Sequence, residues 1–414
     1  MGDTVTVVAT TWRRASVGLA GATVAVALVG AGALPAGAAP ESGLSTRIDQ
    51  VVTAPALGRD VTVAVSVDGQ LLYEYDGDEK QVPASTMKVV TAATSLTALG
   101  VQTRFPTSVV QGDSPEEIIL VGGGDPLLSR GDISKLANKT ARGLKKQGTA
   151  SVSLAVDDYL FPSPSDAPGW APGDSPSYAS AVRALGFAGD YSSDTTSAVR
   201  AAFTSALRDK GITVRDAGRA LASEDAKTLA RIRGGKLSEA IEWMLRVSEN
   251  NVAENLFRHV ALAQGYPATW SGGQAAAREV LQSLGLRTYR LTLIDGSGLS
   301  GKDRLTAESL TQILDRIVDG DHPQLAPILD WLPIAGRSGT LTYRFNGAAS
   351  CARDAVFAKT GSLTGVNTLA GLTKDGQGRW VSFAVMVNHR PMGYPNTSTS
   401  LAVDTIAATV NGCA

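Results

Sequence analysis

The chain has 414 residues, of which 43% are hydrophobic and 19% charged, and its 38 Lys and Arg nearly balance its 39 Asp and Glu. This composition excludes a disordered protein, and the length suggests two or three domains at about 150 residues each. A near-neutral charge without a Lys/Arg block argues against a nucleic-acid partner. The three histidines and two cysteines lack the spacing of a zinc site, so neither a metal nor another cofactor is expected. Any chemistry must therefore come from Ser, Lys, Asp or Glu.

The N-terminal segment has the pattern of a secretory leader. Arg13 and Arg14 precede an Ala/Gly/Val-rich run from Ala15 to Leu34, and Ala36-Gly37-Ala38 follows as a small-residue cleavage site. We therefore expect residues 1–38 to be a signal peptide and the mature protein to be secreted or extracytoplasmic. The alternative is an uncleaved membrane anchor, because the run is about long enough to span a bilayer.

The two cysteines, Cys351 and Cys413, could pair in such an oxidising compartment. A disulfide between them would stabilise the fold by about 4 kcal/mol in the chain-entropy model. The alternative is two independent thiols, because the sequence does not set the distance between them.

The first elements after the leader are a hairpin and a helix. Residues 61–75 predict two strands around a turn at Asp68-Gly69. Apolar spacing then predicts a helix that begins at Ser85 and ends at Gly100.

The middle of the chain mixes strands and helices, and the last third returns to strands. Five prolines in residues 162–178 predict an irregular loop. The other predicted elements of the middle are strands at 118–121 and 151–156 and helices at 133–147, 197–210 and 236–246. The last third predicts an antiparallel meander of strands at 355–359, 368–372 and 381–387, followed by a helix at 400–410.

Strands at both ends of the chain with helical material between them predict one α/β domain, an antiparallel sheet flanked by helices, that is split by an inserted smaller α+β domain. We place the first part at residues 39–104, the insertion at 105–232 and the second part at 233–414.

The first of three short motifs is Ser85-Thr86-Met87-Lys88. A spacing of three at a helix start brings the hydroxyl and the amine together. Serine is a weak nucleophile until a base takes its proton, and a lysine whose pKa is lowered by burial can be that base. Taken alone, the motif is more often a capping serine followed by a surface lysine.

Two further motifs follow in order. Ser248-Glu249-Asn250 supplies a second hydroxyl for proton relay and an amide to bind a carbonyl. Lys359-Thr360-Gly361, continued by Ser362 at the end of a strand, suits a substrate carboxylate. Each has a plain structural interpretation as a turn, but the three together, once each and in this order, are typical of penicillin-binding proteins and β-lactamases.

The chain resembles the class C low-molecular-mass penicillin-binding proteins, the D-alanyl-D-alanine carboxypeptidases and endopeptidases of serine peptidase family S13. The resemblance runs over nearly all of residues 45–412 and includes the motif contexts and four further stretches, namely residues 121–126, 167–170, 295–299 and 339–341. It implies a β-lactamase/transpeptidase-like fold, peptidoglycan stem peptides as substrates and β-lactams as inhibitors.

The resemblance also implies roles for the motif residues. Ser85 would be the acylated nucleophile, Lys88 its base and Ser248 a proton relay helped by Lys359. Asn250 would hold the acyl-side amide. The remaining assignments are carboxylate binding by Lys359, Thr360 and Ser362 beside Gly361, and an oxyanion hole from the backbone N–H groups of Ser85 and Ser362.

Two departures from the family pattern stand out. Glu249 replaces the common Asp of the middle motif, and we expect its side chain to point away from the site. The insertion between Ser85 and Ser248 is shorter than the family usually carries, which affects specificity and partner contacts rather than chemistry.

The leading hypothesis is thus an extracytoplasmic serine DD-peptidase. One alternative is a serine β-lactamase, for which Glu249 or Glu254 would have to activate water. The other is a non-catalytic cell-wall-binding protein, against which the intact motif residues argue.

Overall fold

The computed structural model describes residues 39–162 and 165–413, with side chains from residue 43 onward. The signal peptide expected over residues 1–38 lies outside the described residues. Within the described part of the chain, no helix combines the length and the apolar character needed to cross a membrane.

The first sheet joins the two ends of the chain in the order β2-β1-β10-β9-β8, and all its neighbours are antiparallel. β1 pairs with β10 along its whole length, from Val61 opposite Val387 to Val67 opposite Val381. The strands are β1 (Val61–Val67), β2 (Gln70–Tyr75), β8 (Phe357–Leu363), β9 (Val366–Lys374) and β10 (Trp380–Val387).

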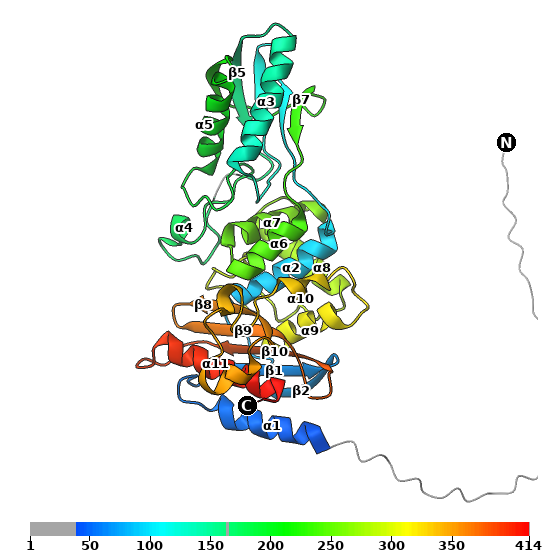
Figure 1. Cartoon of the computed structure of the whole chain (residues 1–414), viewed down its shortest axis with the longest axis vertical. Helices are drawn as coiled ribbons and strands as arrows, with labels where there is room; N and C mark the ends of the chain where they lie inside the picture. Colours follow the sequence, from blue (N-terminus) through cyan, green and yellow to red (C-terminus); the bar gives the residue numbers. More distant parts are fainter. Residues whose placement is uncertain (1–38, 163–164, 414) are drawn as a thin grey trace, which may run out of the picture. The chain divides into compact units, whose positions relative to one another are not determined.

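Helices cover both faces of this sheet. α1 (Ala39–Val52) and α11 (Asn396–Asn411) lie on one face, and α2 (Met87–Leu99) and α9 (Ala307–Val318) lie on the other (Figure 1). Val63 and Val65 belong to the core under α1 and α11, whereas Ala64 belongs to the opposite core. This alternation is the two-residue period of a strand, and burial on both faces explains why every residue of β1 is buried.

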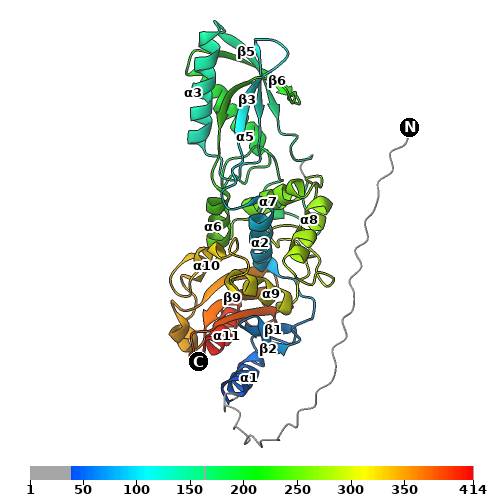
Figure 2. The ribbon, with the colours of Figure 1, turned by 90° about the vertical axis from the view of Figure 1, so that its right-hand side faces the viewer.

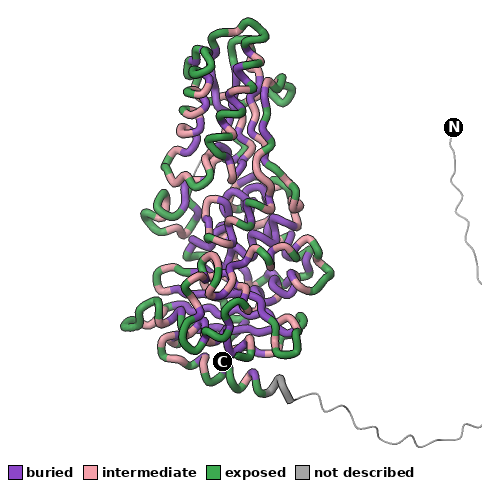
Figure 3. Tube along the Cα trace, viewed as in Figure 1, coloured by how far each residue is buried: buried purple, intermediate pink, exposed green. Residues whose placement is uncertain are grey.

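The core on the α2 side is a bundle of helices. α2 packs against α6 (Leu237–Val247), α7 (Asn250–Ala263) and α8 (Trp270–Ser283) (Figure 2). Residues 87–96 of α2 are all buried, as expected of a helix that is surrounded by others. α10 (Pro327–Trp331) joins the same core, and Figure 3 shows buried residues running through this bundle and the first sheet.

The second sheet is built from the middle of the chain in the order β6-β5-β4-β3-β7. β4, β5 and β6 are parallel, whereas β3 is antiparallel to both β4 and β7. α3 (Arg130–Lys146) and α5 (Thr195–Arg208) are the crossovers between the parallel strands and share a hydrophobic core with the sheet. The strands are β3 (Thr107–Gln111), β4 (Glu117–Val121), β5 (Ser151–Asp157), β6 (Thr213–Arg219) and β7 (Thr228–Ile232).

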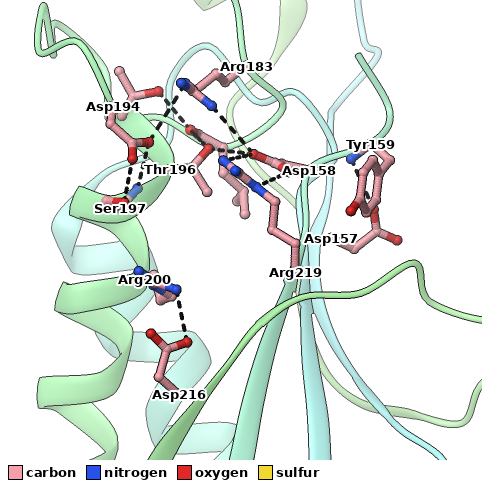
Figure 4. Close-up of polar contacts among 12 residues, drawn as sticks. Asp157, Asp158, Tyr159, Arg183, Asp194, Thr196, Ser197, Arg200, Asp216 and Arg219 are labelled. Atoms are coloured by element: carbon pink, nitrogen blue, oxygen red, sulfur yellow. Dashed lines mark hydrogen bonds and ion pairs between the residues drawn. The ribbon is translucent and has the colours of Figure 1, made fainter. Parts of the chain in front are cut away.

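A polar network fastens the carboxyl ends of the parallel strands. Asp158, just after β5, accepts two N–H groups of Arg219 at 3.0 and 3.1 Å and the Thr196 hydroxyl at 2.9 Å (Figure 4). Arg183 lies 4.0 Å from Asp158 and 3.8 Å from Asp194, which caps α5 by accepting from the N–H of Ser197. The network therefore ties β5, β6 and the start of α5 together.

The structure agrees with the hairpin, the meander and the C-terminal helix expected from the sequence, and it differs at two motifs. Ser85 lies in a 3-10 turn (Ala84–Thr86) before α2, and its side chain makes no capping bond. Residues 359–362 lie inside β8 rather than at its end, because their pairing with β9 continues to Leu363. The described part of the proline-rich segment, residues 165–178, is irregular apart from the short α4 (Asp174–Ser177).

The division into domains at 104/105 and 232/233 stays a prediction, as does the shortening of the insertion. The domain division is supported by the separate hydrophobic core of the second sheet, whose strands all lie between residues 107 and 232.

In the C-terminal part, Cys351 and Cys413 form a disulfide with Cα atoms 5.9 Å apart, which joins the 3-10 helix Gly347–Ala352 to the end of α11.

Candidate active site

Ser85 is half-buried in a tightly held turn. The preceding Ala84 has φ of 46°, a left-handed conformation that costs a non-glycine residue about 1–2 kcal/mol. Two hydroxyls anchor the turn at the Pro83 carbonyl, which accepts from Thr86 at 2.6 Å and from Thr368 of β9 at 2.8 Å. The surrounding structure thus holds the serine in a conformation that the chain would not adopt by itself.

Lys88 lies one turn further along and is completely buried. Its Nζ donates to Ser85 Oγ at 3.0 Å, to Asn250 Oδ1 at 2.7 Å and to the Ser297 carbonyl at 2.8 Å. Burial lowers the pKa of Lys88 to about 8, although the nearby carboxylates of Glu254, Asp295 and Glu249 oppose this shift. An amine with this pKa is partly unprotonated near neutral pH and is in contact with the hydroxyl that it would deprotonate.

The second motif lies at the junction of α6 and α7. Ser248 ends α6 with φ of 64°, and its hydroxyl makes no hydrogen bond within the described chain. Asn250 opens α7 and bridges two segments, because its Oδ1 accepts from Lys88 and its Nδ2 donates to the Tyr178 carbonyl at 2.8 Å. Glu249 caps α7 by accepting from the N–H of Val252, and it also accepts the Tyr191 hydroxyl.

The third motif lies on β8, directly beside the Ser85 turn. Lys359 is completely buried, and its Nζ donates to the Thr360 carbonyl at 2.8 Å. Burial, together with the nearby Lys88, holds the pKa of Lys359 well below its usual range. Thr360 Oγ1 donates to Thr340 Oγ1 at 2.8 Å, whereas the Ser362 side chain is exposed.

Gly361 is the point of closest approach between β8 and the turn. A Cβ on this residue would lie 2.8 Å from the Pro83 carbonyl oxygen and 3.0 Å from the Ser85 backbone nitrogen. Only a glycine leaves room for this approach. The structure therefore brings the first and third motifs together, and Asn250 joins the second to them through Lys88.

Several contacts of the site come from residues to which the sequence motifs assigned no role. The Ser297 carbonyl holds Lys88, and Glu254 holds the backbone of residues 296 and 297. Trp170 of the proline-rich loop donates its indole N–H to Asp295 at 2.8 Å. The sequence signal for these residues was the family resemblance of residues 167–170 and 295–299. The contact between the two stretches joins residues more than one hundred positions apart, so no local pattern predicts it.

The arrangement is suited to acyl transfer. A half-buried hydroxyl contacts a buried amine with a lowered pKa, and a second lysine and several hydroxyls line the neighbouring strand. Comparison with known proteins gives the same indication. The model of the D-Ala-D-Ala carboxypeptidase 3 (S13) family matches residues 44–190 and 188–409.

The chain belongs to this family. A relative, a carboxypeptidase of Mycobacterium tuberculosis, is 33% identical over 391 residues, which cover 87% of this chain and 83% of the relative. Carboxypeptidase DacB of Mycolicibacterium smegmatis is 32% identical over 405 residues, which cover 90% and 84%. The family expected from the sequence motifs is confirmed.

The S13 chain also shares its fold with a solved structure. Penicillin-binding protein 4 from Haemophilus influenzae superposes with a TM-score of 0.76 at 23% identity, covering 86% of this chain and 97% of the other. The expected α/β fold, with an antiparallel sheet flanked by helices, is confirmed by this likeness and by the first sheet described above.

Proposed function

We propose that this S13 protein is a serine DD-peptidase that cleaves D-alanyl-D-alanine ends of peptidoglycan stem peptides through an acyl-enzyme on Ser85. The observation that carries the proposal is the 3.0 Å hydrogen bond between Ser85 Oγ and the completely buried Lys88, whose pKa burial lowers to about 8. A nucleophile in contact with a base of this kind is the arrangement that activates a serine hydroxyl.

The reaction begins when unprotonated Lys88 Nζ takes the Ser85 proton. Ser85 Oγ then attacks the carbonyl carbon of the penultimate D-alanine, and the oxyanion is bound by the backbone N–H groups of Ser85 and Ser362. Collapse of this intermediate breaks the peptide bond, and Ser248 passes a proton to the nitrogen of the departing D-alanine. Water attacks the remaining ester with the same groups acting in reverse, which frees the shortened peptide and restores Ser85.

The other motif residues bind the substrate. Asn250 is placed to hold the acyl-side amide, because it already fixes Lys88 and the Tyr178 carbonyl. Lys359, Thr360 and Ser362 bind the terminal carboxylate, and Gly361 lets their strand approach Ser85. Lys88 and Lys359 lie close enough to interact, because the charge of Lys88 adds to burial in lowering the pKa of Lys359.

The β-lactamase alternative is less well supported. Such an enzyme needs a carboxylate that activates water for rapid deacylation. Glu249 caps α7 and binds Tyr191, while both oxygens of the fully buried Glu254 accept backbone N–H groups. The non-catalytic alternative does not explain why a lysine is completely buried against a serine hydroxyl.

The relatives support the same activity. The Mycobacterium tuberculosis and Mycolicibacterium smegmatis proteins are named carboxypeptidases, and the Haemophilus influenzae protein has been solved in complex with a β-lactam. We therefore propose β-lactams as inhibitors and peptidoglycan as the partner of this chain. We further propose that the protein acts outside the cytoplasm, on the basis of the leader pattern in residues 1–38.

The test is the intact mass of the protein after brief exposure to benzylpenicillin, with Ser85→Ala as the matched variant. A single penicilloyl adduct that persists for minutes and is missing from Ser85→Ala supports the peptidase. Drug consumption without an adduct would point to a β-lactamase, and an intact drug without an adduct to a non-catalytic protein. Release of D-alanine from a stem pentapeptide, compared with cleavage of a cross-linked dimer, then separates carboxypeptidase from endopeptidase activity.

A further inference from the structure

Three carboxyl groups lie completely buried behind Lys88. Glu254 belongs to α7, and Asp295 and Asp303 lie at either end of the loop that follows α8. Burial, together with the nearby Asp295, raises the pKa of Asp303 well above its ordinary range. Burial and the nearby Asp295 raise the pKa of Glu254 too, but the backbone N–H groups of Ser297 and Gly296 and the cationic Lys88 oppose this shift and favour its charged form.

The loop between these acids is held by its backbone. Glu254 accepts from the N–H of Gly296 at 3.0 Å and from the N–H of Ser297 at 2.9 Å, one bond to each carboxylate oxygen. Asp295 accepts from the N–H groups of Gly298 and Ser300, both at 2.7 Å. These bonds satisfy the carboxylates without a cation and fix the direction of the carbonyl groups between them.

Those carbonyls face the catalytic helix. The Ser297 carbonyl accepts from Lys88 Nζ at 2.8 Å, and the Gly296 carbonyl accepts from Thr91 Oγ1 at 2.6 Å. Ser297 thus donates to Glu254 through its N–H and accepts from Lys88 through its carbonyl. The loop has no room to shift, because a Cβ on Gly298 would lie 1.9 Å from the Ala84 carbonyl oxygen.

The remaining charged groups near this assembly are accounted for. Lys88 also faces Asp295, Glu249 and Lys359. Arg258, one turn along α7, is also within electrostatic reach of Glu254, but its guanidinium lies 3.7 Å from the centre of the Trp270 ring and donates to the Ala268 carbonyl at 2.6 Å. Glu254 therefore has Lys88 as a cationic neighbour in the direction of the site.

We propose that Glu254 is a positioning residue for acylation: its carboxylate fixes the Ser297 peptide that holds Lys88, and its negative charge sets the pH at which Lys88 becomes an unprotonated base. The inference rests on the proposed role of Lys88 in deprotonating Ser85. A glutamate suits this place because its two oxygens reach two consecutive N–H groups, and an aspartate is one methylene shorter.

The test is the pH profile of the second-order rate of acylation by benzylpenicillin in the full chain. In Glu254→Gln, the loss of a negative neighbour should lower the pKa of Lys88 and move the rising, acidic limb of the profile, where Lys88 loses its proton, to lower pH by about one unit. Glu254→Asp keeps the charge but not both bonds, so its limb should stay in place while the plateau rate falls about tenfold or more. The matched control is Asp315→Asn, which removes a buried carboxyl that accepts from the hydroxyls of Ser66 and Ser382 instead; its limb should not move.

The outcomes separate the inference from the proposed function. A limb that stays at the wild-type pH in a folded Glu254→Gln, or that moves equally in Asp315→Asn, would overturn the charge effect. If Glu254→Gln does not fold, Glu254→Asp decides, and an unchanged plateau or a displaced limb in that variant contradicts the proposal. Acylation that persists in Ser85→Ala would instead overturn the proposed function, and this inference with it.

Discussion

The closest contact between β8 and the nucleophile's turn makes Gly361→Ala an informative perturbation. The added Cβ would lie 2.1 Å from Thr368 Oγ1, 2.8 Å from the Pro83 carbonyl oxygen and 3.0 Å from the Ser85 nitrogen. Ordinary contacts of this kind begin at 3.4 Å, so β8 or the turn must move. Every one of these neighbours belongs to the turn or to the residue that anchors it.

Two magnitudes follow from that crowding. Overpacking a close contact costs about 1–3 kcal/mol of unfolding free energy. Relieving the shortest contact shifts β8 or the Thr368 hydroxyl that anchors the turn by about 1 Å. A misplacement of that size at the site lowers a rate about 100-fold. The variant should therefore remain folded but acylate about 100-fold more slowly.

The assay is the rate of penicilloyl-adduct formation by mass spectrometry, beside a urea unfolding curve. Gly376→Ala is the matched control, because a Cβ there meets no atom within 4 Å and the residue does not have a positive φ. Thr368→Ala combined with Gly361→Ala should recover part of the loss, since it removes the nearest clashing atom. A wild-type acylation rate in Gly361→Ala would refute the close approach of β8 to Ser85.

Three other predictions concern a histidine, the disulfide and the second lysine. Burial lowers the pKa of His259 to about 4, so the unfolded chain binds more protons between that pH and about 6.5, and the folded state should lose about 3 kcal/mol as the pH falls through this window. When the unfolding free energy is measured in urea at several pH values, its fall toward low pH should be smaller in His259→Gln than in the wild type. An equal fall in both proteins would contradict the prediction. Replacing both Cys351 and Cys413 by Ser should lower the unfolding free energy by about 4 kcal/mol, measured against the untreated protein in urea; an unchanged midpoint would show that the bond does not constrain the unfolded chain. Lys359→Ala should slow hydrolysis of a peptide ending in a free carboxylate by about tenfold more than that of its amide, measured by D-alanine or D-alaninamide release, and equal losses would place its side chain elsewhere.

Much of the local structure and the identity of the site could be read from short stretches of sequence. The alternation of Val and small residues in 61–67 predicts a strand, and Asp68-Gly69 predicts its turn, because both depend on neighbouring residues alone. The ordered triplet of motifs identified the family, since the chemistry of acyl transfer requires these residue types wherever they are placed. The residue types do not, however, predict the burial, the contacts or the pKa of these side chains.

The tertiary structure decided the features that depend on distant parts of the chain. β1 and β10 form one sheet although they lie near opposite ends of the described chain, and the parallel pairing of β4, β5 and β6 is set by crossovers that no local pattern specifies. The 3-10 turn at Ser85 is stable because the Thr368 hydroxyl and the 295–300 loop support it from outside. In the same way, the environment of Lys88 comes from α7 and from the loop carbonyl at Ser297, so its burial and its lowered pKa exist only once those segments have packed around it. The sequence by itself determined which groups we propose to carry the chemistry, and only packing decided their protonation, because a pKa depends on the solvent and charges that the fold removes or brings near.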